Sequence, residues 1–272
     1  MPIKGLAELR QNPTLAVGLA MIALWVVTAL GASWLTSYSA TDSDFLAFLA
    51  PPSSSHLFGT DQLGRDVFSR VLHGGLSVLE VAPAATLLGL VLGSAFGLVA
   101  GYFGGAVDEG MMRTLDAVMA LPIIVLATVA VTMLGSSLVN IIVVIGLIYT
   151  PAVARTVRSA TLGEINKEYV QAAKLRGESL FAILAIEILP NLSGPLIAEG
   201  TTRLGYAVFT SATLGFLGFG IQPPTPDWGL MVSENQAAMT IAPWTVLFPA
   251  AAIAFVVVGF GLVVDGLSEA ER

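Results

Sequence analysis

The stretch AVMALPIIVLATVAVTMLGSSLVNIIVVIGLIYTPAVA, from Ala117 to Ala154, decides the fold class because it contains no charged residue. A helix that spans a membrane needs about 20 mostly apolar residues, so this stretch is too long for one span and suits two. Gly135, Ser136 and Ser137 lie near its middle and are typical turn residues. We therefore predict two spans here, at residues 117–134 and 138–157.

Four further apolar segments lie outside this stretch, and we predict spans at residues 14–36, 79–102, 192–217 and 244–264. The first segment is longer than the apolar core of a cleaved signal peptide, which has about 7–15 residues. We therefore interpret it as a retained signal-anchor helix. The sequence as a whole predicts a single domain, residues 1–272, of an all-α membrane protein with six transmembrane helices.

The composition agrees with a membrane protein, since 55% of the residues are hydrophobic and only 11% are charged. Soluble domains carry about 25% charged residues, which they need for a polar surface. A net charge of −7 argues against binding of nucleic acid. The chain has no cysteine, which excludes disulfides and thiolate ligands. His56 and His73 have no HExxH context, so we expect no metal site.

The basic residues predict the orientation in the membrane. If the N-terminus lies inside, the external connections between the predicted spans contain Arg65 and Arg70. The cytoplasmic segments then contain Lys4, Arg10, Arg113, Arg155, Arg158, Lys167, Lys174, Arg176 and Arg272. This distribution follows the positive-inside rule, so we expect both termini in the cytoplasm.

The long cytoplasmic connection, residues 158–191, contains the sequence EYVQAAKLRGESLFAILAIEILPNLSGPL from Glu168 onward. Its composition predicts a short helix from Glu168 to Arg176, a break at Gly177, and a second helical stretch, 179–188, that ends near Pro190. The small residues Ala172, Ala173 and Gly177 would let the backbone of another protein approach closely. The connection is therefore either a docking element or a loop that covers the bundle.

The same connection resembles the EAA motif of ABC importer permeases, which reads Glu-Ala-Ala, three residues, Gly, nine residues, then Ile-x-Leu-Pro. Here Gln171-Ala172-Ala173, Gly177 and Leu189-Pro190 stand at that spacing. Glu168-Tyr169-Val170 and Asn191 resemble the dipeptide/oligopeptide/nickel branch of these permeases. Two positions depart from the pattern: Gln171 replaces the motif's Glu, and Glu187 stands where the branch usually has His. The contact of that histidine therefore has no obvious counterpart.

Three other blocks resemble the same branch, namely Phe58–Gly75, Ala100–Pro122 and Leu214–Glu234, and Asp265-Gly266-Leu267 completes the pattern. The resemblance covers nearly the whole chain. It implies a type I ABC importer permease-like bundle in a bacterial plasma (inner) membrane. The ATPase-coupling residues that it implies are Glu168, Tyr169, Gln171, Ala172, Ala173, Arg176, Gly177, Glu187, Leu189 and Pro190.

The resemblance also implies a function and partners. It indicates the C-type permease of an ATP-driven importer for di- or oligopeptides, which forms half of the translocation pathway. Its partners would be a second homologous permease, two ATPase subunits, an extracytoplasmic solute-binding protein and membrane lipid. ATP and magnesium would bind the ATPase subunits, because this chain has no GxxxxGK[ST] phosphate loop and we expect no cofactor in it.

Two groups of charged residues have both a structural and a functional interpretation. Asp61, Arg65, Asp66 and Arg70 precede the second predicted span, where we expect an amphipathic helix on the outer membrane surface. They would form either an internal scaffold or a docking site for the solute-binding protein. Within the fifth span, Glu199 and Arg203 stand four residues apart. They would either pair with each other or line the pathway.

An intramembrane enzyme and a membrane scaffold are alternatives to a transport subunit. An intramembrane enzyme would need a nucleophile–base pair or metal ligands within the bundle. The predicted spans contain no His or Cys, and the chain has no GxSxG sequence, so we expect no enzyme activity in this chain. A non-catalytic membrane scaffold is a further alternative. Nickel chelates, glutathione-like peptides and opines are alternative solutes.

Overall fold

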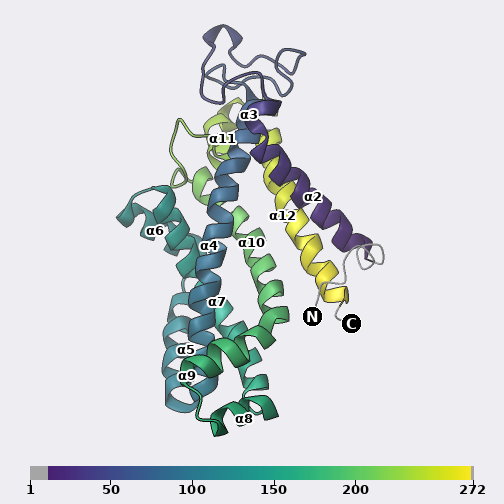
Figure 1. The fold of residues 1–272 in the computed structure, drawn as a ribbon. Helices are drawn as coiled ribbons and strands as arrows, with labels where there is room; N and C mark the ends of the chain where they lie inside the picture. Colours follow the sequence, from purple (N-terminus) through teal and green to yellow (C-terminus); the bar gives the residue numbers. More distant parts are fainter. Residues whose placement is uncertain (1–11, 271–272) are drawn as a thin grey trace.

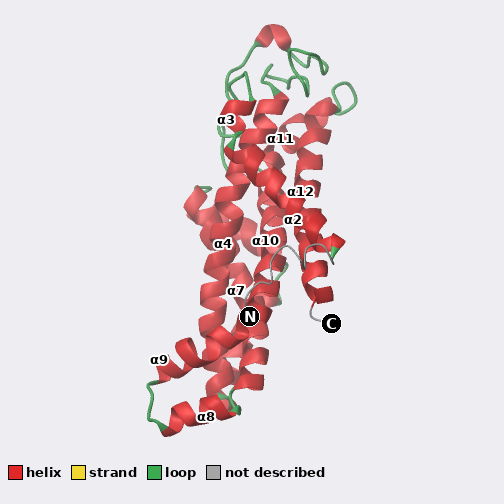
Figure 2. Cartoon of the chain, turned by 45° about the vertical axis from the view of Figure 1, so that its right-hand side comes forward, coloured by secondary structure: helices red, strands yellow, loops and turns green. Residues whose placement is uncertain are grey.

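The computed structural model describes residues 12–270, which form an elongated bundle of helices without β-strands (Figures 1 and 2). This confirms the predicted all-α class. The elements are α2 (Pro13–Leu30), α3 (Ala32–Leu35), η1 (Phe45–Ala47), α4 (Val67–Phe103), α5 (Gly105–Met119), α6 (Ile123–Leu134), α7 (Leu138–Glu164), α8 (Glu168–Leu175), α9 (Leu180–Ala182), η2 (Ile183–Ile188), η3 (Leu189–Leu192), α10 (Ser193–Phe216), α11 (Trp228–Asn235), η4 (Gln236–Ala238) and α12 (Trp244–Ala270).

Five helical runs within the described residues are long and apolar enough to cross a membrane. They are α2, α4, α7, the run Leu180–Phe216 that ends with α10, and α12. Each contains most or all of one predicted span. The α5–α6 pair would make a sixth span if it crosses as one unit.

The predicted span 117–134 differs from the structure, because it is not one helix. α5 ends at Met119, α6 begins at Ile123, and the two helix axes differ in direction by 86°. Pro122 lies at this break. It has no backbone N–H to continue the ladder of α5, and it disfavours helical geometry at the residue before it. The predicted turn after this segment is present, since Gly135 takes φ +89° between α6 and α7.

The second span also differs, because α4 begins at Val67 and not near residue 79. The separate amphipathic helix that we predicted before this span is therefore not formed: Arg70 lies in the first turns of α4, and Asp61, Arg65 and Asp66 precede the helix. Farther along, α4 packs on α7 through glycines. A Cβ on Gly93 would lie 2.5 Å from the Cβ of Val153, so the two backbones approach more closely than any larger residue allows.

α2 and α12 form an antiparallel pair beside α10 and α4 (Figure 1). Gly18 of α2 lies against the Gly259 carbonyl of α12, again without room for a Cβ. Asn12 caps the start of α2 and also donates a hydrogen bond of 2.7 Å to the Gly266 carbonyl. This bond ties the beginning of α2 to the last turns of α12.

The two ends of the bundle differ in structure (Figure 2). The loop end contains the connections 36–66 and 217–243, with α11 between α10 and α12. The α8 end contains α8, α9 and η2. The main hydrophobic core includes Trp25 and Trp228, and a second, smaller core lies at the α8 end.

Candidate functional site

The predicted helix–break–helix motif is present at the α8 end. Glu168 and Lys174 lie in the first and last turns of α8, where each charge complements the helix dipole. Gly177 then takes φ +72°, and the Glu178 N–H donates to the Ala173 carbonyl at 3.2 Å. This is a glycine C-cap, which turns the chain sharply from α8 toward α9.

One face of α8 packs on the rest of the chain. Val170 and Ala173 are fully buried. They contact a small core to which α4, α7, η2 and η3 contribute Leu98, Val153, Val157, Ile183, Leu184, Ile188 and Leu192. We expected Ala173 to admit the backbone of another protein, and this is wrong, because its own chain already covers it. The signal missed was the apolar spacing of Val170 and Ala173, three residues apart on one face.

The opposite face of α8 is exposed. Glu168, Gln171 and Leu175 lie on it at a spacing of three and four residues, which puts them on one side of a helix. Ala172, beside them, is half-buried. Leu175 is 90% exposed, which is unusual for a leucine that ends a helix beside a hydrophobic core. We call the side chains of Glu168, Gln171, Ala172 and Leu175 the outer face of α8.

Two aromatic contacts hold α8 in place. The Tyr169 hydroxyl donates a hydrogen bond of 2.8 Å to Glu164 at the end of α7. Burial, together with this carboxylate, raises the pKa of the Tyr169 phenol to about 12, so it stays a donor at neutral pH. The Lys174 ammonium lies 4.9 Å from the ring centre of Tyr102, which is in α4.

Glu187 has a partner in this chain. Arg176 follows α8, and its Nη2 lies 2.6 Å from Glu178 and 3.2 Å from Glu187. The guanidinium thus connects the end of α8 to η2 across the corner at Gly177. Glu187, which stands where the related permeases usually have histidine, therefore forms an ion pair across the turn at Gly177.

We predicted that the second helical stretch ends near Pro190, and this prediction is wrong. The chain stays helical from Leu180 to Phe216. η2 is a wide π-type turn and η3 a tight 3₁₀ turn, with Leu189 and Pro190 at the start of η3. Such changes of helix type can accommodate a proline that cannot donate its own hydrogen bond. Leu189 packs on the small core, and Pro190 is exposed.

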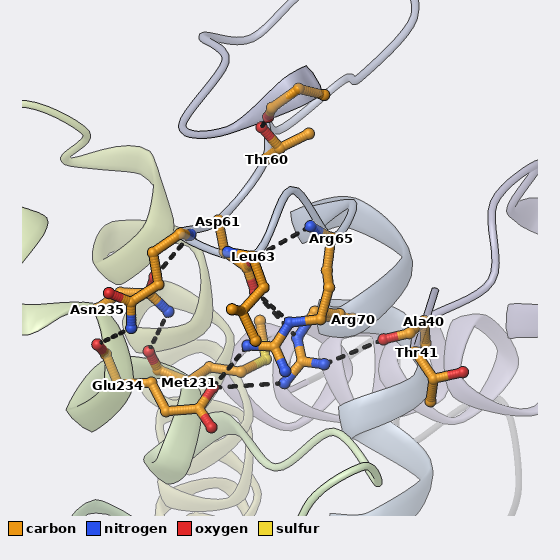
Figure 3. A network of polar contacts seen from close by, with 12 residues as sticks. Ala40, Thr41, Thr60, Asp61, Leu63, Arg65, Arg70, Met231, Glu234 and Asn235 are labelled. Carbon is orange, nitrogen blue, oxygen red and sulfur yellow. Dashed lines mark hydrogen bonds and ion pairs between the residues drawn. The ribbon is translucent and has the colours of Figure 1, made fainter. Parts of the chain in front are cut away.

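The predicted charged residues at the loop end form a buried cluster (Figure 3). Arg65 Nε lies 2.7 Å from Asp61, and Arg65 Nη2 lies 2.8 Å from Glu234 of α11. Arg70 lies 3.7 Å from Asp61 and donates to the Ala40 carbonyl at 3.0 Å. The cluster joins the connection before α4 to α11, as a scaffold would. Glu234 was not predicted as a member of this cluster, because it is 169 residues away from Arg65 in the chain.

Asp66 has a separate role beside this cluster. Its carboxylate caps α4 by accepting the Ser69 N–H at 2.7 Å, and it lies 2.9 Å from Nδ1 of His56. Asp66 therefore fixes the residue at which α4 begins. Docking of another protein on this end stays a prediction.

The charged pair in α10 is formed. Arg203 Nε lies 2.6 Å from Glu199, and Glu199 also accepts a hydrogen bond of 3.0 Å from Thr156 of α7. The Arg203 guanidinium lies 5.7 Å from the ring centre of Tyr149 and 5.3 Å from that of Tyr206. The pair is mostly buried, so self-pairing is present; a role in the pathway stays a prediction.

Further ion pairs lie nearer the α8 end. Glu109 and Arg113, four residues apart, form an ion pair on the surface of α5. Two pairs that we did not predict link α5 to α7, Asp108–Arg158 and Asp116–Arg155. They hold α5 along the lower part of α7.

Comparisons with known proteins agree with these features. Residues 93–270 match the family described as binding-protein-dependent transport system inner membrane component. The dipeptide transport system permease protein DppC of Alkalihalophilus pseudofirmus is 39% identical over 97% of this chain and 86% of its own length. The glutathione transport system permease protein GsiD of Pectobacterium atrosepticum is 38% identical over 96% of this chain and 87% of its own.

A further relative is GsiD of Escherichia coli O6, which is 40% identical over 96% of this chain and 86% of its own length. The similarity therefore covers the α8 end, the loop end and the helices between them. The apolar helical runs identify a multi-pass protein, and the matched family consists of inner-membrane components of transport systems. The chain belongs to the family of binding-protein-dependent transport system inner membrane components, the permease subunits of ABC importers.

Proposed function

We propose that this chain is the permease through which an ATP-driven importer takes up di- or oligopeptides, and that α8 couples it to a separate ATPase subunit. The observation that carries this proposal is the division of α8 into two faces. Val170 and Ala173 bind α8 to the ends of α4 and α7, while the outer face is largely exposed, with one hydrogen bond of 3.0 Å from Gln171 to the Ile165 carbonyl. A force on the outer face would therefore reach two membrane-spanning helices.

The complex that we propose contains a second homologous permease, two ATPase subunits and an extracytoplasmic solute-binding protein. The α8 end faces the cytoplasm, both termini lie there, and the loop end faces outward. ATPase closure would then move the α8 end as a rigid body and switch the bundle between outward-open and inward-open states. A non-catalytic scaffold would show no ATP-driven uptake in a reconstituted complex.

The docking step can be tested at Leu175. Replacing it with Glu places a charge on the outer face without touching the small core, so this chain should reach normal membrane levels. We expect Leu175→Glu to reduce co-purification of the ATPase subunits strongly. The matched control is Leu46→Glu, since Leu46 is fully exposed at the opposite end. Equal co-purification with both variants would contradict docking on the outer face of α8.

The solute is best tested by direct uptake. A dipeptide permease and glutathione permeases are similar to this chain at nearly the same identity, 38–40%. Glutathione-like peptides are therefore a second candidate, and nickel chelates and opines remain alternatives within the branch. Uptake of a labelled dipeptide and of labelled glutathione by the complex in vesicles, each with competition by the other, separates the two leading candidates.

A further inference from the structure

Glu80 is the one acidic residue of α4, and the proposed function gives it no role. Its side chain is exposed, while Val81 and Ala82, next to it, are fully buried. No hydrogen bond or ion pair to Glu80 is formed among residues 12–270. The other charged side chain of α4, Arg70, is paired in the loop-end cluster. Glu80 is therefore an uncompensated charge on a membrane-spanning helix.

The depth of Glu80 follows from the contacts of its neighbours. A Cβ on Gly75 would lie 3.2 Å from Ala29 and 3.3 Å from Trp25, so Gly75 is level with the last turns of α2. Glu80 lies five residues further along α4, or about 7–8 Å deeper. This is level with the middle of α2. Charged side chains at this depth face protein or a water-filled cavity, because lipid solvates them poorly.

The same face of α4 leads to a polar pocket at the loop end. His73 stands seven residues before Glu80, which is about two turns and nearly the same side of the helix. It lines a pocket of about 500 Å³ together with Thr36, Tyr38 and Thr225. His73 Nδ1 lies 2.9 Å from the Ser69 carbonyl, so the ring is held in place. His73 in this hydroxyl-rich pocket and the unpaired Glu80 thus lie about two turns apart on one face of α4.

We propose that Glu80 lies in the solute pathway and holds the cationic amine of a solute that enters past the pocket beside His73. This inference rests on the proposed function, since it assigns a solute-binding residue to the permease. The amino terminus of a peptide is an ammonium group at neutral pH, with a pKa of about 7.7–8.0. A carboxylate binds such a group by a charge-assisted hydrogen bond. In a water-filled pathway, water would replace the solute at Glu80, so the bond would be brief.

The position of Glu80 can be tested by cysteine labelling, because the natural chain has no cysteine. Glu80→Cys in the assembled complex is treated with thiosulfonate reagents that carry a trimethylammonium or a sulfonate group. Leu24→Cys is the matched control, since Leu24 lies at a similar depth on α2 and is 55% exposed. We expect labelling at position 80 and none at position 24. If position 80 stays unlabelled both without nucleotide and in the ATP-bound state, Glu80 faces lipid or a closed subunit interface, and the proposal is wrong.

The role of the charge is tested by uptake of a labelled dipeptide. We expect Glu80→Gln to lower uptake about tenfold, which corresponds to one charge-assisted hydrogen bond. Glu80→Asp should restore most of it, and Glu109→Gln, which removes a surface carboxylate, should leave it unchanged. Wild-type uptake by Glu80→Gln would overturn the amine contact. A wild-type complex that takes up no peptide although position 80 is labelled would contradict the proposed solute and leave the placement of Glu80 in the pathway standing.

Discussion

Arg65 Nη2 and Glu234 Oε2 lie 2.8 Å apart and join parts of the chain that are 169 residues apart in sequence. The Asp61 carboxylate holds the same guanidinium from the other side, at 2.7 Å. Gln62 adds a hydrogen bond to the Glu234 carbonyl. The connection before α4 and helix α11 are therefore held together by polar contacts at the loop end.

Asp61 should contribute more to stability than Glu234. The Asp61 side chain is 2% exposed and pairs with two buried guanidinium groups, whereas that of Glu234 is 22% exposed. Breaking a buried pair costs about 3–5 kcal/mol, because it leaves a charge without a partner. We expect Asp61→Ala to lower the unfolding temperature in detergent strongly and Glu234→Ala to lower it less. Equal shifts would contradict a larger contribution of Asp61 than of Glu234.

The Glu199–Arg203 pair predicts a particular order among three variants. Glu199→Ala leaves Arg203 near the rings of Tyr149 and Tyr206, which attract a cation. Arg203→Ala leaves Glu199 with Thr156 alone. We therefore expect Arg203→Ala to reduce the amount of folded protein most, Glu199→Ala less, and the double variant less than Arg203→Ala. Size-exclusion chromatography of fluorescently tagged variants measures this order, and a double variant as poor as the worse single one would refute the coupling.

Gly177 should tolerate asparagine but not valine. No atom lies within 4 Å of the place where a Cβ would stand, so only the positive φ of +72° opposes a side chain. Asparagine enters this region at little cost, and a β-branched residue does not. Gly177→Val should reach normal membrane levels but lose ATPase association, because the corner after α8 opens. Gly177→Asn should behave like the wild type, and similar loss in both variants would point to a steric cause.

The stability of the fold should depend on the ionisation of Asp227. Its Oδ1 caps α11 by accepting the Leu230 N–H at 2.8 Å, and burial raises its pKa from 3.8 to about 6. Asp227 therefore binds a proton more readily in the folded state than in the unfolded chain. The resulting stabilisation is present below about pH 4 and is lost as the pH rises through about 6, a change on the order of 3 kcal/mol.

Asp227→Asn keeps an oxygen that can cap α11 but does not titrate. Unfolding temperatures of both proteins between pH 4 and pH 7 give the comparison. The wild type should lose stability relative to the variant across this interval. A constant difference between the two would mean that the carboxyl group does not titrate there.

The orientation in the membrane can be measured with reporter fusions. We expect fusions after residue 45, after residue 165 and at the C-terminus to report outside, inside and inside, respectively. The first two positions lie at the loop end and near the start of α8, at opposite ends of the bundle. An external signal at residue 165 would contradict the proposed orientation, in which the α8 end faces the cytoplasm.

The apolar segments and the corner at Gly177 were predictable from the sequence because each depends on neighbouring residues. The break at Pro122 was not, since Pro83, Pro151 and Pro249 all lie inside continuous helices. Whether a proline ends a helix depends on what packs around it, and single-sequence rules do not contain this information.

The buried position of Ala173 and the pairing of Glu234 were missed for a related reason. Both depend on contacts between distant parts of the chain. Small residues in α8 suit packing against the same chain as well as docking of another, and only the position of α4 and α7 decides between the two.

The close contact between α4 and α7 has a mechanical consequence. With glycines between the two backbones, the helices cannot slide past each other without large changes in packing, so they form one stiff rod. α4 has 37 residues and is therefore about 55 Å long, nearly twice the thickness of the hydrocarbon layer. Tilting such a rod by about 10° around its midpoint displaces each end by about 5 Å, in opposite directions. The α4–α7 pair thus has the geometry of a lever, in which a small tilt moves the loop end and the α8 end in opposite directions.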